Sequence, residues 1–302
     1  MSNLDRKPLV SVIIPTYKRS EMLPRAIDSV LCQTYANVQI VVVDDNNPDT
    51  EWRKTTESTM KKYGEESRVK YVCHEKNKNG AAARNTGIRE ADGEIVCFLD
   101  DDDWFYTEKI EMQVEYLLSH PEYRAVYCGW DRAGKKVVPT RTGNLSYNIL
   151  SGDNIIYTNA IMMWKENALA CGGWDETFKR HQEAAFLLRY FRSGEEIGVI
   201  SKSLVGIDIS DRSNMAANSD INQQHVEHYL ASYSDIIEAC EVQRKGAKRD
   251  ILSHRYRGVL LAHIKSKNYK SAARVYFNML KKMPIKFNTD IIRYALKRVH
   301  HG

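Results

Sequence analysis

The chain has 302 residues, of which 43% are hydrophobic and 27% are charged, and its net charge at pH 7 is +5. These values are typical of a soluble globular protein with one large or two modest domains, and no apolar run is long enough to cross a bilayer. The six cysteines are scattered without a C-x-x-C pair, which favours reduced thiols in a cytoplasmic protein over a disulfide framework or a zinc site.

The charge is unevenly distributed along the chain. Residues 243–302 contain 16 Lys or Arg and two acids, a net charge of +14, which leaves −9 for the rest. An acidic body with a basic C-terminal segment indicates an anionic partner for that segment, a membrane surface or a nucleic acid. The alternative is a solvated helical face without a partner.

The first hundred residues alternate between apolar runs and polar or amphipathic stretches. Near-continuous apolar strands separated by helices are typical of a parallel sheet covered on both faces. The predicted strands span residues 9–15, 38–43, 69–73 and 95–99, and the predicted helices span residues 23–31, 51–63 and 81–91.

Polar side chains follow three of these strands at the point where each strand ends. They are Thr16, Tyr17 and Arg19 after the first strand, Asp44 and Asp45 after the second, and four consecutive aspartates, residues 100–103, after the fourth. Right-handed crossovers bring the carboxyl ends of parallel strands to one edge of a sheet, where ligands bind. Carboxylates there are typical ligands of Mg2+ or Mn2+, and the alternative is a solvated acidic turn before the next helix.

Three common motifs are absent from the sequence. It contains no G-x-G-x-x-G after the first strand, no G-x-x-x-x-G-K-[ST] and no G-x-S-x-G. These absences argue against a dinucleotide-binding fold, a P-loop NTPase and a hydrolase with a nucleophile elbow.

The second half contains shorter strands and then helices. Strands are predicted at residues 125–130, 135–138, 155–157, 161–164 and 199–209, and the polar residues 210–219 are predicted to form a loop over the site. From about residue 221 the pattern is helical, with apolar residues at helical spacing that include Ala272, Val275, Met279, Ile291, Ile292, Ala295, Leu296 and Val299.

Four segments in order resemble the motif series of family 2 glycosyltransferases with the GT-A fold. They are SVIIPTYKR at residues 11–19, VDDN at 43–46, GAAARNTGI at 80–88 and FLDDDD at 98–103. The resemblance continues through GGWDE at 172–176 and RHQE at 180–183, so it covers roughly residues 8–210. The final ninety residues match no motif of that family.

The resemblance implies roles for residues of the first half. The end of the first strand, with Pro15, Thr16, Tyr17 and Arg19, is implied to wrap the base and ribose of a nucleotide-sugar donor. Asp45 is implied to accept the uracil N3–H in relatives that use UDP-sugars.

The other implied donor and metal residues lie further along the chain. Arg84 is implied to reach the nucleotide or its diphosphate. Asp100, Asp101 and Asp102 occupy the D-x-D position, where Asp102 is the implied ligand of Mn2+ or Mg2+ and Asp100 contacts ribose and donor sugar. A histidine ligand is common further along such chains, but none occurs here between His181 and His225, which leaves the ligand set open.

Glu183 is the implied general base. Relatives more often carry Asp at this position, so Glu lengthens the reach of the carboxylate by one methylene. The alternative is an acid that merely stabilises the first turn of a helix. Asn159 and Trp164 could line the sugar site but are not assigned to it, since an aromatic side chain in an apolar run more often belongs to the core.

The sequence thus predicts an α/β protein with a GT-A catalytic domain over residues 1–215 and a basic, amphipathic helical region over residues 216–302. The nucleotide-binding half would cover about residues 1–104, and the acceptor half about 105–215. The C-terminal helices either lie on an anionic membrane surface or pack on the catalytic domain or a second copy of the chain. Nucleic acid is not the expected partner.

The predicted activity is inverting, metal-dependent transfer of a sugar, from a UDP-sugar, to a saccharide or lipid-linked saccharide during polysaccharide assembly. The expected location is the cytoplasm, at the inner face of the cell membrane. The alternatives are an inactive sugar-nucleotide-binding scaffold and an NDP-sugar nucleotidyltransferase.

Overall fold

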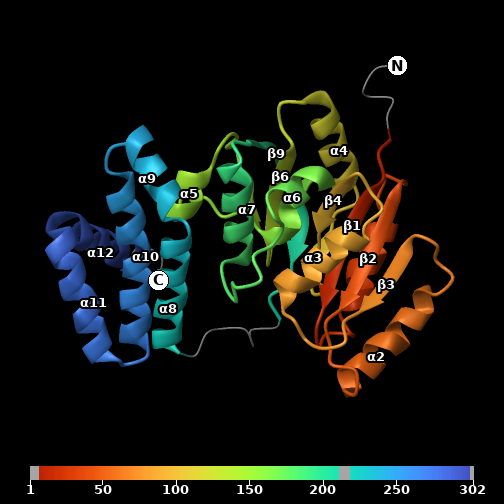
Figure 1. Cartoon of the computed structure of the whole chain (residues 1–302), viewed down its shortest axis with the longest axis horizontal. Helices are drawn as coiled ribbons and strands as arrows, with labels where there is room; N and C mark the ends of the chain where they lie inside the picture. The colour runs from red at the N-terminus through yellow and green to blue at the C-terminus, as the bar shows by residue number, and fades with distance from the viewer. Residues whose placement is uncertain (1–6, 211–217, 300–302) are drawn as a thin grey trace. The chain divides into compact units, whose positions relative to one another are not determined.

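The computed structural model describes residues 7–210 and 218–299, without the side chains of residues 297–299. It contains two compact units, one made of residues 1–145 and 156–211 and the other of residues 146–155 and 212–302 (Figure 1). The second unit therefore includes a short segment from the middle of the chain, residues 146–155, which lies within the range 1–215 predicted for the catalytic domain.

The first unit is built on one mixed sheet with the strand order β3-β2-β1-β4-β8-β6-β9-β5, and β7 pairs with β6 (Figure 1). The strands are β1 Val10–Thr16, β2 Val38–Asp44, β3 Val69–Cys73, β4 Ile95–Phe98, β5 Trp104–Phe105, β6 Ala125–Arg132, β7 Lys135–Val137, β8 Ile161–Trp164 and β9 Ile197–Ile207. The β3-β2-β1-β4 half is parallel, as predicted. β8 is antiparallel to its neighbours β4 and β6, and β9 is parallel to β6.

The helices of this unit are α1 Leu23–Leu31, α2 Glu51–Met60 with the 3-10 turn Lys61–Tyr63, α3 Gly80–Glu90, α4 Lys109–Ser119, α6 Lys165–Ala170 and α7 Gln182–Arg192. Thr50 caps α2 by accepting from the backbone N–H of Arg53, and Asn79 caps α3 by accepting from Ala81 and Ala82. α3 packs closely on the sheet because Gly87 lacks a side chain: a Cβ there would lie 2.2 Å from Ile13 Cγ2.

Two local predictions were wrong. Residues 155–157 form no strand; they precede the 3-10 turn Thr158–Ala160, and Ile155 is 57% exposed. Ile156 is buried, but none of the described strands pairs with these residues, so an extended strand is not stabilised there. The apolar residues Phe178, Ala185, Phe186, Leu188 and Phe191 predict one helix, but the helix with Glu183 begins at Gln182 and does not include Phe178. Most of the predicted loop, residues 211–217, lies outside the described residues.

The second unit is a helical bundle of α5 Ser146–Ser151, α8 Ser219–Ser232, α9 Ser234–Gln243, α10 Ala247–Lys265, α11 Tyr269–Lys282 and α12 Pro284–Val299 (Figure 1). Ala272, Val275 and Met279 of α11 are buried, as their spacing predicted. On α12, Phe287 is fully buried, whereas Ile292 and Leu296 of the predicted apolar face are 57% and 55% exposed. No helix in the described part of the chain is both long and apolar enough to span a membrane.

Candidate active site

The polar side chains that follow β1 and β4 meet at one edge of the sheet. Thr16 Oγ1 donates to Asp101 Oδ2 at 2.7 Å, and Arg19 Nη1 lies 2.6 Å from Asp102 Oδ2 and 3.5 Å from Asp101 Oδ1. The end of β2 joins the same edge, because the backbone N–H of Asp45 donates to Thr16 O at 3.0 Å. The juxtaposition expected from parallel strand order is therefore present.

Arg84 links this edge to the helix that carries Glu183. Its Nη2 donates to Asp100 Oδ1 at 2.5 Å, and its Nη1 donates to Gln182 Oε1 at 3.1 Å. The guanidinium also lies 4.8 Å from the ring centroid of Trp174, whose indole stacks on Phe186 of α7 with centroids 4.4 Å apart. Glu183 follows Gln182 in the first turn of α7 and is half-buried.

The aspartate turn is crowded with negative charge. Asp101 and Asp103 are 4% and 6% exposed. Loss of hydration is the main cause that raises the pKa of Asp101 to about 7 and that of Asp103 to about 8, with repulsion from neighbouring aspartates adding to both shifts. The pKa of Asp102 is raised for the same reasons.

Three of these carboxylates fit a divalent cation. One oxygen from each of Asp100, Asp102 and Asp103 lies within 4.8 Å of the others. An all-oxygen donor set of clustered carboxylates suits a hard cation such as Mg2+ or Mn2+. Asn159, in the 3-10 turn before β8, holds both Asp100 and Asp103. Its Oδ1 accepts from the backbone N–H of Asp100 at 2.9 Å, and its side-chain amide donates to the Asp103 carboxylate.

Asp45 is buried, and both of its oxygens are engaged by the segment after β3. Oδ1 accepts from His74 Nδ1 at 2.7 Å and from the backbone N–H of Lys78 at 2.8 Å. Oδ2 accepts from Asn77 Nδ2 and the backbone N–H of Asn79, both at 2.9 Å. A carboxylate has about four lone-pair sites, so a base N–H that reaches Asp45 must replace one donor. The exposed Asn77 amide has a second acceptor in Asp45 O at 3.0 Å.

The remaining predicted residues lie on the loop after β1. Pro15 belongs to β1 itself, where it pairs with Val43 of β2. Tyr17 is 41% exposed, and Lys18 Nζ lies 4.9 Å from the centroid of its ring. Tyr17 therefore has an open aromatic surface beside the aspartate turn, and its backbone N–H donates to Asp101 Oδ2 at 3.4 Å.

Sequence reasoning missed two charged residues of the site. Arg25 of α1 donates to the backbone carbonyl of Asp102 and to Asp208 Oδ2, the latter at 2.7 Å. The backbone N–H of Asp208 donates to Asp103 Oδ1 at 2.8 Å. Asp208 directly follows β9, so the signal used for Asp44 and Asp100 would have found it. Arg25 offered no such signal, because only the packing of α1 brings it here.

Comparisons with known proteins agree with this geometry. Residues 11–186 match the model of Glycosyl transferase family 2. An uncharacterized glycosyltransferase of Rickettsia felis is 34% identical over 220 residues, 68% of this chain, although the match spans only 34% of that protein. The UDP-Glc:alpha-D-GlcNAc-diphosphoundecaprenol beta-1,3-glucosyltransferase WfgD of Escherichia coli is 38% identical over 37% of this chain and 42% of its own.

A similar solved structure is that of the mannosyltransferase PcManGT from Pyrobaculum calidifontis, in complex with GDP-Man and Mn2+. It superposes with a TM-score of 0.60 over 99% of this chain and 89% of its own, at 17% sequence identity. At that identity the likeness shows the fold alone, which is the predicted GT-A type with an added helical segment.

Proposed function

This chain belongs to glycosyl transferase family 2, and from that premise we propose that it transfers a sugar from a UDP-sugar, with inversion, to a hydroxyl group of a lipid-linked saccharide. The observation that carries the proposal is the meeting of Thr16, Arg19 and Arg84 with the aspartate turn at one sheet edge. The name of WfgD, which specifies a UDP-Glc donor and a diphosphoundecaprenol acceptor, supports the choice of donor and acceptor.

Each site residue has a role in this proposal. Asp102, with Asp100 and Asp103, would hold Mn2+ or Mg2+. A bound divalent cation stabilises the negative charge that develops on the leaving diphosphate. Arg84 and Arg19 add fixed positive charge, and Pro15, Thr16, Tyr17, Asp45 and Asp101 form the wall for base and ribose.

Inversion needs one displacement at the anomeric carbon. The acceptor oxygen bonds to that carbon as the bond to the diphosphate oxygen breaks, and the acceptor proton passes to the Glu183 carboxylate. The link from Arg84 through Gln182 to α7 supports this role, because it holds the first turn of that helix beside Asp100.

Calorimetric titration of the whole chain tests the donor. We expect UDP to bind in the presence of Mn2+ and at least tenfold more weakly without it, because the metal and the diphosphate bind each other, and we expect GDP to bind more weakly than UDP. Binding of GDP in preference to UDP would move the assignment to a GDP-sugar. A chain that binds neither nucleotide with Mn2+ present would overturn the proposal.

We also propose that the second unit lies on an anionic membrane surface through α12. Ile285, Ile292 and Leu296 share one exposed face of this helix, with exposures of 80%, 57% and 55%. Among the described side chains of α11 and α12 the only acid is Asp290, which pairs with Lys286 at 3.2 Å. An exposed apolar stripe among lysines and arginines is typical of a helix that lies in the headgroup region.

Vesicle sedimentation tests this surface. We expect the chain to bind vesicles that contain phosphatidylglycerol and not vesicles of phosphatidylcholine alone. The variant Ile292→Glu should lower this binding about tenfold, because it places a carboxylate in the apolar stripe. Thr55→Glu, on the other unit, is the matched control and should bind like the wild type. Equal binding of the wild type to the two vesicle types would contradict the assignment. So would binding of Ile292→Glu to phosphatidylglycerol vesicles as strong as that of the wild type.

A further inference from the structure

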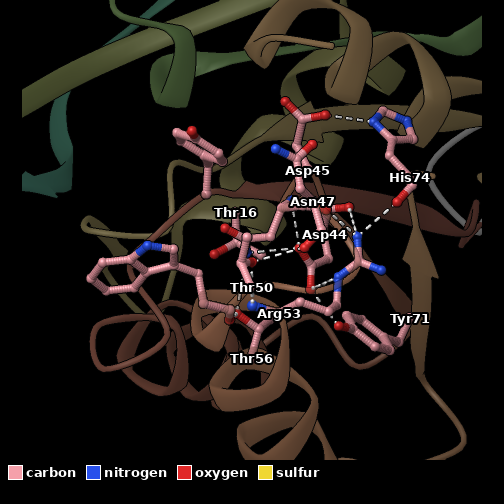
Figure 2. A network of polar contacts seen from close by, with 12 residues as sticks. Thr16, Asp44, Asp45, Asn47, Thr50, Arg53, Thr56, Tyr71 and His74 are labelled. Carbon is pink, nitrogen blue, oxygen red and sulfur yellow. Dashed lines mark hydrogen bonds and ion pairs between the residues drawn. The ribbon is translucent and has the colours of Figure 1, made fainter. Parts of the chain in front are cut away.

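A buried ion pair lies directly behind the proposed base-binding wall. Asp44, the last residue of β2, is fully buried, and Arg53 of α2 is 6% exposed. Arg53 Nε lies 3.0 Å from Asp44 Oδ2, and the Tyr71 hydroxyl of β3 donates to the same oxygen at 2.5 Å (Figure 2). Asp44 Oδ1 accepts from both the backbone N–H and the side-chain amide of Asn46 at 2.8 Å.

The guanidinium of Arg53 also bonds to the backbone of two different loops. Its Nη2 donates to His74 O at 2.7 Å and to Asn46 O, and lies 3.4 Å from Asp44 O (Figure 2). Asn46 and Asp44 flank Asp45 in the chain, and the His74 side chain bonds to the Asp45 carboxylate. One side chain therefore fixes the backbone on both sides of Asp45 and the residue that orients its carboxylate.

His74 extends this network to α3. Its Nδ1 lies 2.7 Å from Asp45 Oδ1 (Figure 2). Its Nε2 lies 2.9 Å from Thr86 Oγ1. Further along the same loop, the backbone N–H groups of Lys78 and Asn79 each donate to the Asp45 carboxylate. The position of the Asp45 carboxylate thus depends on this loop, and the backbone of the loop at His74 is held by Arg53.

We propose that Arg53 is a positioning residue for recognition of the donor base: by joining the ends of β2 and β3 it holds the Asp45 carboxylate where the base N–H meets it. This inference rests on the proposed use of a uridine nucleotide. It assigns Arg53 to base selectivity and to donor affinity, not to the transfer step, because no described contact joins Arg53 to Glu183 or to the aspartate turn.

The chemistry of this position favours arginine. Nη2 alone faces the three carbonyls, and Nε faces the Asp44 carboxylate at 3.0 Å, so the planar guanidinium serves both groups from two nitrogens held in one plane. The ammonium of lysine has a single nitrogen on a flexible stem and cannot face the carbonyls and the carboxylate from two fixed positions. Removal of the charge alone would leave Asp44 buried and unpaired, so the charge-conserving change is the informative one.

The ratio of UDP to CDP affinity measures the position of Asp45. Uracil presents an N–H donor at N3, whereas cytosine presents a lone pair there, which a carboxylate repels. The two nucleotides share the ribose and diphosphate, so damage elsewhere in the site weakens both equally. A loss of overall stability likewise leaves their ratio unchanged when both are titrated below the unfolding temperature.

The experiment titrates UDP and CDP, each with Mn2+, into the wild type and Arg53→Lys. We expect the wild type to prefer UDP and the variant to lose about tenfold of that preference, the effect of one charge-assisted hydrogen bond. Arg68→Lys is the matched control, because Arg68 pairs at the surface with Glu66 at 2.8 Å and should keep the wild-type ratio.

A second variant keeps the test valid if Arg53→Lys does not fold. Asp44→Asn combined with Arg53→Gln removes both buried charges together, and it should also lose the preference for UDP. A folded variant of either kind with the wild-type ratio would overturn the inference while leaving the transferase proposal intact. A wild type that binds UDP and CDP equally would also overturn it. A wild type that binds no nucleotide would instead overturn the proposed function on which it rests.

Discussion

Asp102→Asn is expected to lower kcat/KM by on the order of 10³-fold and to remove the effect of Mn2+ on UDP binding. The physical reason is that the amide of asparagine is neutral, so it binds a hard divalent cation far more weakly than a carboxylate. Asp102 is the carboxylate of the cluster that also faces Arg19, at 2.6 Å, so the change alters one cation contact besides the metal.

Two measurements distinguish the effect of losing the metal ligand from the effect of losing the contact with Arg19. The affinity for UDP without Mn2+ measures the part of the effect of Asp102→Asn that does not involve the metal. The ratio of UDP affinities with and without Mn2+ measures the contribution of the metal alone. Asp92→Asn is the control, because Asp92 is exposed and lies just before β4, at the opposite edge of the sheet from the aspartate turn. If Asp102→Asn keeps the Mn2+ effect of the wild type, the metal site is not at Asp102.

Glu183→Gln is expected to lower kcat by roughly 10²–10⁴-fold, the range for removal of a general base. The amide is similar in shape and cannot accept the acceptor proton. Affinity for UDP should stay within about twofold of the wild type, because a base that acts on the acceptor is not needed to bind the donor. Stopped-flow release of UDP and titration of UDP, on the same preparation, give the two quantities.

Two further variants, Glu183→Asp and Glu166→Gln, serve as controls for this test. Glu183→Asp should keep part of the rate that Glu183→Gln loses, because the carboxylate is retained. Glu166→Gln is the neutral control, since Glu166 lies on α6 with its side chain 72% exposed. If Glu183→Gln keeps the wild-type kcat, Glu183 only stabilises the first turn of α7, the alternative that the sequence left open. A wild type that binds UDP without any turnover would favour the scaffold alternative.

The sequence determined the parallel half of the fold and the polar edge of the sheet. Buried apolar strands leave only one way to place the polar residues that follow them, because the carboxyl ends of parallel strands meet at one edge. Thr16, Arg19 and the aspartate turn are in contact as that rule requires. The family followed from the same segments, since four motifs in order constrain the chain far more than any one does.

Only the tertiary structure decided which distant side chains support the site. Arg25, Asn159 and Asp208 reach the aspartate turn from three separate elements, and no local pattern sets those distances. The same holds for α12, where spacing identifies an apolar face but cannot say whether neighbouring helices cover it. Periodicity is a property of one segment, whereas burial and hydrogen-bond partners depend on how segments pack. For Asp45 the sequence located a carboxylate at the edge, and the packing of β2, β3 and α2 decided what holds it there.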